Sequence, residues 1–184
     1  MQTSTATTCT IPVTALRAAP YNLDWGASVF AKVIAINLYG DSTESDDGNG
    51  AIITTSPDPP TDLTEDYFLR TATTLGFNWV PPTFTGGATI NYYRINIAVQ
   101  GEAFSILQNG VFGTSYTAFG LTPGVTYEFK IESRNSYGYS AYSETLTLFC
   151  AFKPEAPETV STTNENDLIK VSWSEPNVNG SPIT

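Results

Sequence analysis

Two acidic groups in this chain have residue types that could bind a metal ion. Residues 44–50 read Glu-Ser-Asp-Asp-Gly-Asn-Gly and gather carboxylate and amide oxygens, the ligands that calcium takes. A calcium site needs six or more oxygens, and the loop pattern with its distant glutamate is missing here. The second group is Asp58, Asp62, Glu65 and Asp66. Solubility and protection of a strand edge account for both groups, so we expect solvated turns and no metal site.

Catalytic chemistry finds little support in the residue types present. The 184 residues include no histidine, which removes the commonest general base and metal ligand. There is no Gly-x-Ser-x-Gly elbow and no phosphate loop. Gly48–Ile53 begins like a dinucleotide fingerprint but lacks its third glycine, and a bent last strand explains it better. We therefore expect no catalytic, cofactor-binding or metal-binding residue, and no enzymatic activity.

The aromatic residues could instead bind a partner molecule. Tyr137, Tyr139 and Tyr142, with Phe84 near them in the fold, form a candidate interaction surface for an unidentified protein or glycan partner. The turn at residues 21–26 is expected to lie near residues 81–87 and 137–142, so Trp25 is a further candidate, packed against Phe84 or Tyr137 where two repeated units meet. Packing between modules, tyrosines on a sheet face and partly exposed turn aromatics are the alternatives.

Composition excludes other classes of partner. The net charge is −10 with only eight Lys and Arg residues, so the basic footprint that nucleic-acid binding needs is missing. Hydrophobic residues make up 41% and charged residues 14%, which indicates a folded chain. No apolar run reaches the length of a membrane span. The two cysteines, Cys9 and Cys150, are predicted to be free thiols, half-buried in strands.

The elements that position these residues repeat at a spacing of 98 residues. Residues 35–42 read Ala-Ile-Asn-Leu-Tyr-Gly-Asp-Ser, and residues 133–140 read Ser-Arg-Asn-Ser-Tyr-Gly-Tyr-Ser. Lys32 and Lys130 match at the same spacing. Residues 77–87 also resemble residues 171–181 further along the chain. This period is typical of a β-sandwich module.

Between the repeated marks, apolar residues alternate with polar ones, as strands require. In residues 125–133 the side chains of Val125, Tyr127, Phe129 and Ile131 fall on one face, with charged residues on the other. No stretch has the apolar period of an amphipathic helix. Short strands separated by Gly and Pro turns predict an all-β sandwich.

The chain resembles the fibronectin type III family on the residues that mark its strands and turns. These are Pro60, Leu63, Trp79, Tyr93-Arg94-Ile95, Leu121, Gly124, Tyr127, Asn135, Gly138 and Ser140, with Trp173 as the next copy of Trp79. The resemblance implies an immunoglobulin-like Greek-key sandwich. Trp79 is expected to fill the core, the Tyr127 hydroxyl to bond back to the preceding turn, and Gly138 to adopt an unusual backbone angle.

The same resemblance divides the chain into tandem modules. Residues 57–153 are expected to form one complete module. Residues 1–56 are expected to be the last three strands (E, F and G) of a preceding module, with Val29 at the corner tyrosine position. Residues 154–184 are expected to be strands A and B of a following one, so the chain is interpreted as a window from a longer array. The short, proline-rich connection at residues 55–60 predicts a semi-rigid rod.

We therefore interpret the chain as a non-enzymatic structural and protein-interaction segment of a larger modular protein, a spacer or adhesive array. Its partners would be the neighbouring modules and an unidentified protein or glycan. The Thr-rich, acidic composition favours an extracellular or cell-surface location. The alternatives are accessory modules of a large secreted enzyme, or an intracellular scaffold.

Overall fold

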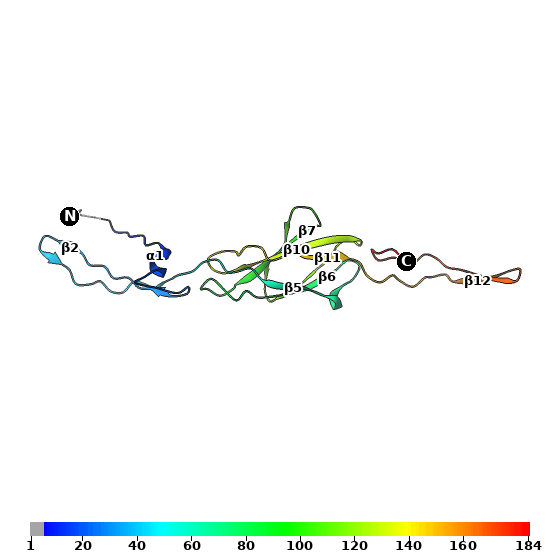
Figure 1. The fold of residues 1–184 in the computed structure, drawn as a ribbon, viewed down its shortest axis with the longest axis horizontal. Coiled ribbons are helices and arrows are strands. Elements are labelled where there is room, and N and C mark those ends of the chain that lie inside the picture. Colours follow the sequence, from blue (N-terminus) through cyan, green and yellow to red (C-terminus); the bar gives the residue numbers. More distant parts are fainter. Residues whose placement is uncertain (1–5) are drawn as a thin grey trace.

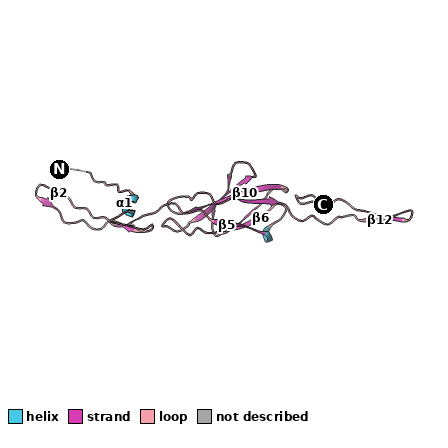
Figure 2. Cartoon of the chain, in the orientation of Figure 1, coloured by secondary structure: helices cyan, strands magenta, loops and turns pink. Residues whose placement is uncertain are grey.

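The computed structural model describes residues 6–184 as an elongated row of three parts (Figure 1). A sandwich lies in the middle, an N-terminal segment extends on one side, and a C-terminal hairpin extends on the other. Figure 2 shows that strands dominate the regular structure and that the helical turns are short. The predicted all-β, immunoglobulin-like class is confirmed.

The middle sandwich has two antiparallel sheets. The three-stranded sheet has the order β5-β6-β9, and the four-stranded sheet has the order β11-β10-β7-β8. The chain crosses between the sheets after β6, after β8 and after β9, as in a Greek key. The strands are β5 (Thr61–Asp66), β6 (Leu75–Val80), β7 (Tyr92–Val99), β8 (Ser105–Val111), β9 (Ser115–Ala118), β10 (Val125–Arg134) and β11 (Leu146–Cys150).

Strand alternation places the apolar side chains between the two sheets. Phe77 on β6 and Phe129 on β10 are fully buried, and their ring centroids lie 4.6 Å apart. Trp79 packs edge-on against Tyr93 at 5.3 Å. Each such side chain contributes roughly 1.5–3 kcal/mol by leaving water. The outward residues of β10 are charged except for Thr126, so the outer face of this sheet can form ion pairs and hydrogen bonds.

The corner before β10 is fixed by one hydrogen bond. The Thr122 N–H donates to the Tyr127 hydroxyl at 3.0 Å. Tyr127 is buried, and Leu121 beside the turn is buried too. The bond therefore ties the turn to the strand that follows it, as the sequence predicts for a tyrosine corner.

The N-terminal segment forms a long hairpin and one helical turn. The elements are α1 (Val13–Arg17), β1 (Ser28–Val29), β2 (Ile36–Asn37), β3 (Gly40–Asp41) and β4 (Ala51–Ile52). β1 pairs with β4, and β2 pairs with β3. Cys9 is exposed and lies outside any strand, contrary to expectation, whereas Cys150 is buried.

The strand expected before this hairpin is a helical turn instead. The Pro12 carbonyl accepts hydrogen bonds from the N–H groups of Ala15 at 3.0 Å and Leu16 at 3.4 Å. A strand here would need a neighbouring strand for its backbone groups, and none lies beside it among residues 6–184. A helical turn satisfies those groups locally.

The C-terminal hairpin repeats the first hairpin of the sandwich. β12 (Ser161–Glu165) pairs with β13 (Leu168–Ser172) as β5 pairs with β6. Both hairpins have a residue with a positive φ near the start of their first strand. In the sandwich it is Asp62, at 52°, in the irregular pairing between Thr61 and Thr64, and in the C-terminal hairpin it is Thr159, at 50°, just before β12. Within the described chain no second sheet packs on this hairpin. Trp173, expected to be a core residue like Trp79, is therefore 61% exposed.

Candidate functional site

The N-terminal hairpin meets the sandwich through main-chain hydrogen bonds, at what we call the first junction. The Thr55 N–H donates to the Gly86 carbonyl at 2.9 Å, and the Asp58 N–H donates to the Phe84 carbonyl at 3.0 Å. The connection thus pairs with the loop between β6 and β7 like a short strand. Pro57 is buried in it and fixes one of its φ angles.

Two glycines let the backbones touch at this junction. Gly26 and Gly87 both have positive φ, 89° and 81°. A Cβ atom on Gly87 would collide with the Gly26 nitrogen and lie 2.9 Å from the Ile53 carbonyl oxygen. The Gly26 N–H donates to that same Ile53 carbonyl at 2.8 Å. No larger residue fits at position 87 without moving the two parts of the chain apart.

The side chain of Asn135 connects the sandwich to the linker. Its amide nitrogen donates to the Thr55 carbonyl at 2.7 Å and to the Thr85 carbonyl at 2.8 Å. Its oxygen accepts hydrogen bonds from the N–H groups of Tyr137 and Gly138. The residue is fully buried, so one amide shapes its own turn and holds the linker in place.

The unusual backbone angle predicted for Gly138 is wrong. Gly138 is not among the positive-φ glycines, and a Cβ atom there would meet nothing within 4 Å. Asn135 holds this turn through its side-chain oxygen, so the glycine keeps an ordinary conformation. One period earlier, Gly40 does have a positive φ of 135°.

The second junction, between the sandwich and the C-terminal hairpin, has the same hydrogen bonds. The Phe152 N–H donates to the Asn179 carbonyl at 2.9 Å, and the Glu155 N–H donates to the Asn177 carbonyl at 3.0 Å. The Asn179 side-chain amide adds a hydrogen bond to the Lys153 carbonyl at 2.9 Å.

The glycine contact repeats there as well. Gly124 and Gly180 have φ angles of 80° and 91°. A Cβ atom on Gly180 would lie 2.5 Å from the Gly124 nitrogen and 2.9 Å from the Cys150 carbonyl oxygen. Gly124 and Gly180 thus correspond to Gly26 and Gly87. The two junctions thus share their two linker hydrogen bonds, the glycine contact and the hydrogen bond that the first glycine donates.

A second feature covers the outer face of the four-stranded sheet, and we call it the cation–aromatic face. At its centre Arg94 makes two hydrogen bonds to the Glu132 carboxylate, at 2.7 and 2.6 Å, and Asn96 adds a third at 3.0 Å. Glu132 and Asn96 are buried although both point outward from the sheet. The hydrogen bond to Glu132 raises the pKa of Arg94. The face consists of Tyr92, Arg94, Asn96, Phe104, Lys130, Glu132, Arg134, Tyr139 and Tyr142.

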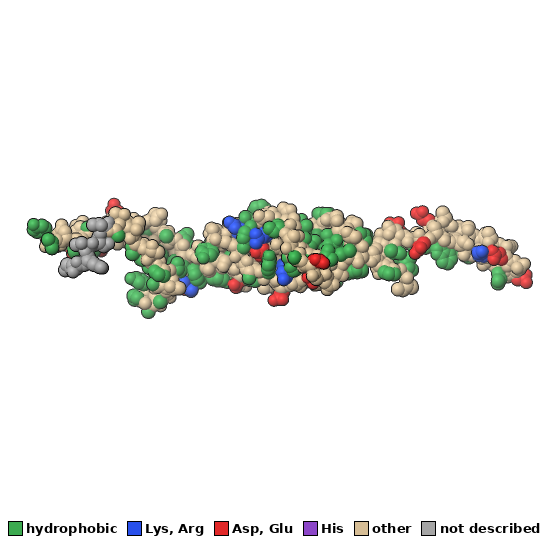
Figure 3. Space-filling view, turned by 90° about the horizontal axis from the view of Figure 1, so that it is seen from above, with side chains coloured by type: hydrophobic (Ala, Val, Ile, Leu, Met, Phe, Trp, Pro, Cys, Tyr) green, Lys and Arg blue, Asp and Glu red, His purple; other side chains and the backbone are tan. Residues whose placement is uncertain are grey.

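Aromatic rings cover the cations of this face. The Arg94 guanidinium lies 3.8 Å from the centroid of the Tyr139 ring, and that of Arg134 lies 4.7 Å from it. The Lys130 ammonium lies 4.4 Å from the Phe104 ring centroid. Cation–π attraction therefore accounts for the position of Tyr139 over the buried ion pair. In the view of Figure 3, Lys and Arg side chains gather over the middle of the molecule.

In the segment after β10, each of two serines that bond to β10 follows a tyrosine that lies over a cation of the outer face. Ser140 and Ser143 point toward β10, where their hydroxyls accept hydrogen bonds from the N–H groups of Ser133 and Ile131, both at 2.9 Å. Tyr139 lies on the outer, cation–aromatic face. We call this serine–aromatic arrangement the latch, since it fastens the chain to β10.

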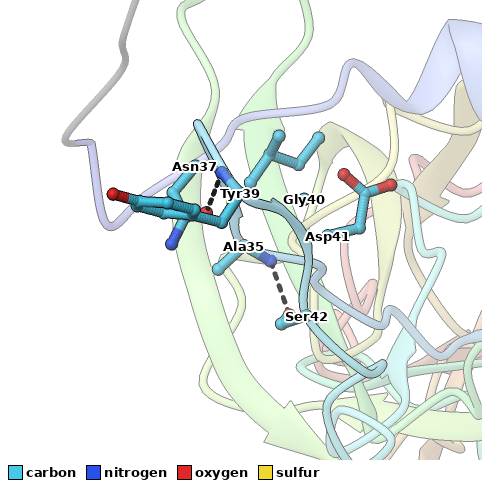
Figure 4. Close-up of a pocket in the computed structure, with 7 residues that line it drawn as sticks. Ala35, Asn37, Tyr39, Gly40, Asp41 and Ser42 are labelled. Carbon is cyan, nitrogen blue, oxygen red and sulfur yellow. Dashed lines mark hydrogen bonds between the residues drawn. The ribbon is translucent and has the colours of Figure 1, made fainter.

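The N-terminal hairpin carries the same latch with charges in place of rings. The Ser42 hydroxyl accepts from the Ala35 N–H and the Ser45 hydroxyl from the Val33 N–H, both at 3.0 Å. Figure 4 shows the hairpin tip, where the Asn37 side chain accepts from the Tyr39 N–H at 2.8 Å. Lys32, the counterpart of Lys130, forms an ion pair with Glu44 at 3.1 Å. Glu44 occupies the position of Tyr142.

The family model of the fibronectin type III domain matches residues 58–149, half of the chain. The chain belongs to the fibronectin type III family. The matched residues are those of the middle sandwich, which is therefore a fibronectin type III module.

Curated relatives contain this segment as a small part of longer proteins. A Kelch domain-containing protein of Saccharolobus solfataricus is 34% identical over 124 residues, 67% of this chain and 16% of the relative. Mouse protein sidekick-1 is 27% identical over 158 residues, 83% of this chain and 7% of the relative. The chain thus spans less than a fifth of either relative.

Among solved structures, the crystal structure of domains A168-A170 from titin matches with a TM-score of 0.55. It covers 70% of this chain and 42% of that chain at 21% identity. This likeness shows the fold of the fibronectin type III module and nothing of its partners.

The residues predicted to mark the module lie where its packing is densest. Trp79, Tyr93, Leu121, Tyr127 and Asn135 are all at most 9% exposed. Of the predicted interaction residues, Tyr137 is 65% exposed, while Phe84 and Trp25 are half-buried. Trp25 packs under the Arg17 guanidinium, 4.3 Å from its ring. Its contact with Phe84 or Tyr137 stays a prediction.

Metal-binding and membrane-spanning features are missing from residues 6–184. No group of three His, Cys, Asp or Glu side chains is placed to hold a metal ion there. The acidic residues Glu44 and Asp47 contact Lys32 instead, at 3.1 and 3.7 Å. In the same part of the chain, no helix is long and apolar enough to cross a membrane.

The predicted approach of residues 21–26 to residues 81–87 is confirmed by the contact between Gly26 and Gly87, but sequence reasoning singled out neither glycine and predicted nothing of the second junction. The repeated stretches at residues 77–87 and 171–181 align Gly86 with Gly180, so the correspondence of Gly87 with Gly180 needs a one-residue shift that only the structure shows. The pairing of Arg94 with Glu132 has no local signal, because it depends on the register between β7 and β10.

Proposed function

We propose that this chain is a non-enzymatic spacer and protein-interaction segment of a larger modular protein. Residues 57–153 are a complete fibronectin type III module in this proposal. Residues 1–56 are the C-terminal part of a preceding module, and residues 154–184 are the N-terminal part of a following one. The chain carries no catalysis, metal or cofactor of its own.

The repeated junction carries this proposal. Contacts formed by chance between two neighbouring parts would differ from one pair to the next. Here both junctions use two linker hydrogen bonds and a glycine pair with positive φ. A contact that repeats every module sets one fixed angle between successive modules, which is what a spacer needs.

Partner binding is the second part of the proposal. Tyr137, exposed at the tip of its turn, is the tyrosine most available to a protein or glycan partner. Tyr139 and Tyr142 lie over cations, and Phe84 and Trp25 lie at the first junction, so these four act mainly through packing.

We further propose an extracellular or cell-surface location, supported by the acidic, Thr-rich composition. An intracellular scaffold is the alternative. Brief protease treatment of intact source cells, followed by blotting for residues 57–153, separates the two. Loss of the band supports the surface location, and its survival supports the scaffold.

Small-angle X-ray scattering of the 184-residue chain tests the spacer role. We expect the profile of one elongated particle with the arrangement of Figure 1, unchanged between dilute samples. A profile that requires a broad ensemble of orientations between the three parts would refute the proposal.

A further inference from the structure

The connection between the first two strands of the middle module differs from that of the C-terminal hairpin. β12 and β13 are joined by residues 166–167 alone, whereas β5 and β6 are joined by residues 67–74. The longer connection includes a 3-10 turn, η1 (Tyr67–Leu69). Tyr67 is 72% exposed and Phe68 is 100% exposed. Two large aromatic side chains are thus exposed to solvent on a connection that has no counterpart in the C-terminal hairpin.

This turn is held rigidly despite its exposure. The Asp66 carboxylate accepts a hydrogen bond from the Phe68 N–H at 3.1 Å, and the Thr74 hydroxyl donates to the Leu69 carbonyl at 2.9 Å. Leu69 packs directly over Gly76, where a Cβ atom would lie 2.5 Å from that of Leu69. The backbone that carries the two aromatic rings is therefore already ordered before binding, which favours affinity.

A hollow of about 350 Å³ lies beside the turn, at the second junction. Arg70 connects the two, since its guanidinium lies 5.5 Å from the Tyr67 ring centroid and its side chain lines the hollow. The hollow joins the middle module to the C-terminal hairpin. Its lining residues are Arg70, Phe149, Ala151, Phe152, Lys153 and Ser181.

The polar side chains that line the hollow are two cations and a hydroxyl, with no carboxylate among them. The Arg70 guanidinium uses its Nε for Glu65, at 2.5 Å, and one Nη for the Ala151 carbonyl, at 3.4 Å. The Lys153 ammonium has no carboxylate within ion-pair distance among the described residues. Because Arg70 is already paired with Glu65, Lys153 is the uncompensated cation of the hollow, and it makes the hollow a local site for an anionic group in a chain of net charge −10.

We propose that the hollow and the Tyr67–Phe68 turn together bind an acidic segment of a partner protein. A carboxylate of that segment lies between Lys153 and Arg70, and an apolar side chain packs on Phe68 and Tyr67. The inference rests on the protein-interaction part of the proposed function and names its surface. It does not depend on the spacer role, which the scattering experiment tests separately.

An acidic protein segment fits better than a polyanion. Long polyanions such as nucleic acids or sulfated glycans gain affinity from many cations, and the hollow supplies two. The negative charge of the rest of the chain repels a ligand more strongly the more anionic groups it carries, so it penalises a long polyanion more than a short acidic segment. Exposed aromatic side chains on an ordered turn are instead typical of protein interfaces.

Fluorescence anisotropy with a short labelled peptide of alternating glutamate and leucine tests the site on the full 184-residue chain. We expect saturable binding that weakens about tenfold or more in Lys153→Glu and in Phe68→Ala. Both positions are exposed, so neither change threatens the fold. Lys170→Glu and Phe112→Ala, an exposed cation and an exposed aromatic elsewhere, are the matched controls and should bind as the wild type does.

Three outcomes would overturn the proposal. The first is no binding at millimolar peptide, and the second is equal binding of a peptide with glutamine in place of glutamate. The third is tighter binding of a sulfated hexasaccharide with no loss in Phe68→Ala, which would make the hollow a glycan site.

Discussion

At the scale of single residues, the middle module depends on polar side chains buried where the sheet would ordinarily face water. Glu132 is 6% exposed, yet it lies on the outer face of β10. Arg94, Asn96 and the covering Tyr139 ring make this possible by supplying hydrogen bonds and excluding solvent. A buried carboxylate is stable only while its cation stays in place.

Removing Arg94 should therefore destabilise the module strongly. We expect Arg94→Ala to lower the free energy of unfolding by about 3–5 kcal/mol, because Glu132 would be left buried without its cation. Lys130→Ala, on the neighbouring strand, is the control and should cost only about 0.5–1 kcal/mol, the value of a cation–ring contact. Urea unfolding followed by circular dichroism measures both, and equal losses in the two variants would contradict the assignment.

The core residues were predictable from the sequence, whereas this ion pair was not. Phe129 and Ile131 are buried because apolar and polar residues alternate along their strand, and this pattern can be read from neighbouring residues in the sequence. Arg94 and Glu132 are 38 residues apart and meet only because β7 and β10 pair in one register. Asn135 was identified as a turn residue, but its bond to Thr55 crosses a junction that no local pattern encodes.

At the scale of elements, the latch appears in two chemical versions. In the middle module Lys130 lies 5.6 Å from the Tyr142 ring centroid, and in the N-terminal hairpin Lys32 pairs with Glu44. The serine hydrogen bonds of the latch are the same in both. In each latch a lysine thus has a favourable partner, which is an aromatic ring in the middle module and a carboxylate in the N-terminal hairpin.

Exchanging one version for the other tests this equivalence. We expect Tyr142→Glu to be more stable than Tyr142→Ala at low salt, because a carboxylate there can pair with Lys130 as Glu44 pairs with Lys32. The difference should disappear near about 1 M salt, where the Debye length is about 3 Å. Urea unfolding at both salt concentrations measures it. If Tyr142→Glu matched Tyr142→Ala at low salt as well, the two latches would not be equivalent.

Elements were predictable wherever both partners of a strand pair lie within the chain. Strands β6, β7, β10 and β13 follow the apolar alternation, whereas β12 is wholly polar and was expected only from the family resemblance. The helical turn α1 replaced an expected strand because no strand lies beside it in the described chain to accept its backbone hydrogen bonds. Strand propensity is decided by such neighbours more than by the local sequence.

At the scale of the whole molecule, we expect stiffness to come from the junctions more than from the length of the linkers. Each junction combines linker hydrogen bonds with a glycine contact that leaves no room for a side chain. The proline-rich linker predicts a semi-rigid rod, and residues 21–26 were expected to meet residues 81–87, but neither prediction identifies the residues of the glycine contact and the hydrogen bonds. Those residues come from loops far apart in the sequence, and their contact depends on the complete fold.

The most direct test of this account is a distance measurement across the first junction. Spin labels at the exposed positions Thr43 and Thr147, in a Cys9→Ser background, report the distance between hairpin and sandwich by double electron–electron resonance. Gly87→Ala would force the junction apart. Gly101→Ala, at a similar φ of 87° with nothing within 4 Å of its Cβ, is the matched control.

We predict one narrow distance distribution for the wild type and for Gly101→Ala, and a broad one for Gly87→Ala. A broad distribution in the wild type, or a narrow, unchanged one in Gly87→Ala, would contradict the claim that the glycine junction holds the modules at a fixed angle.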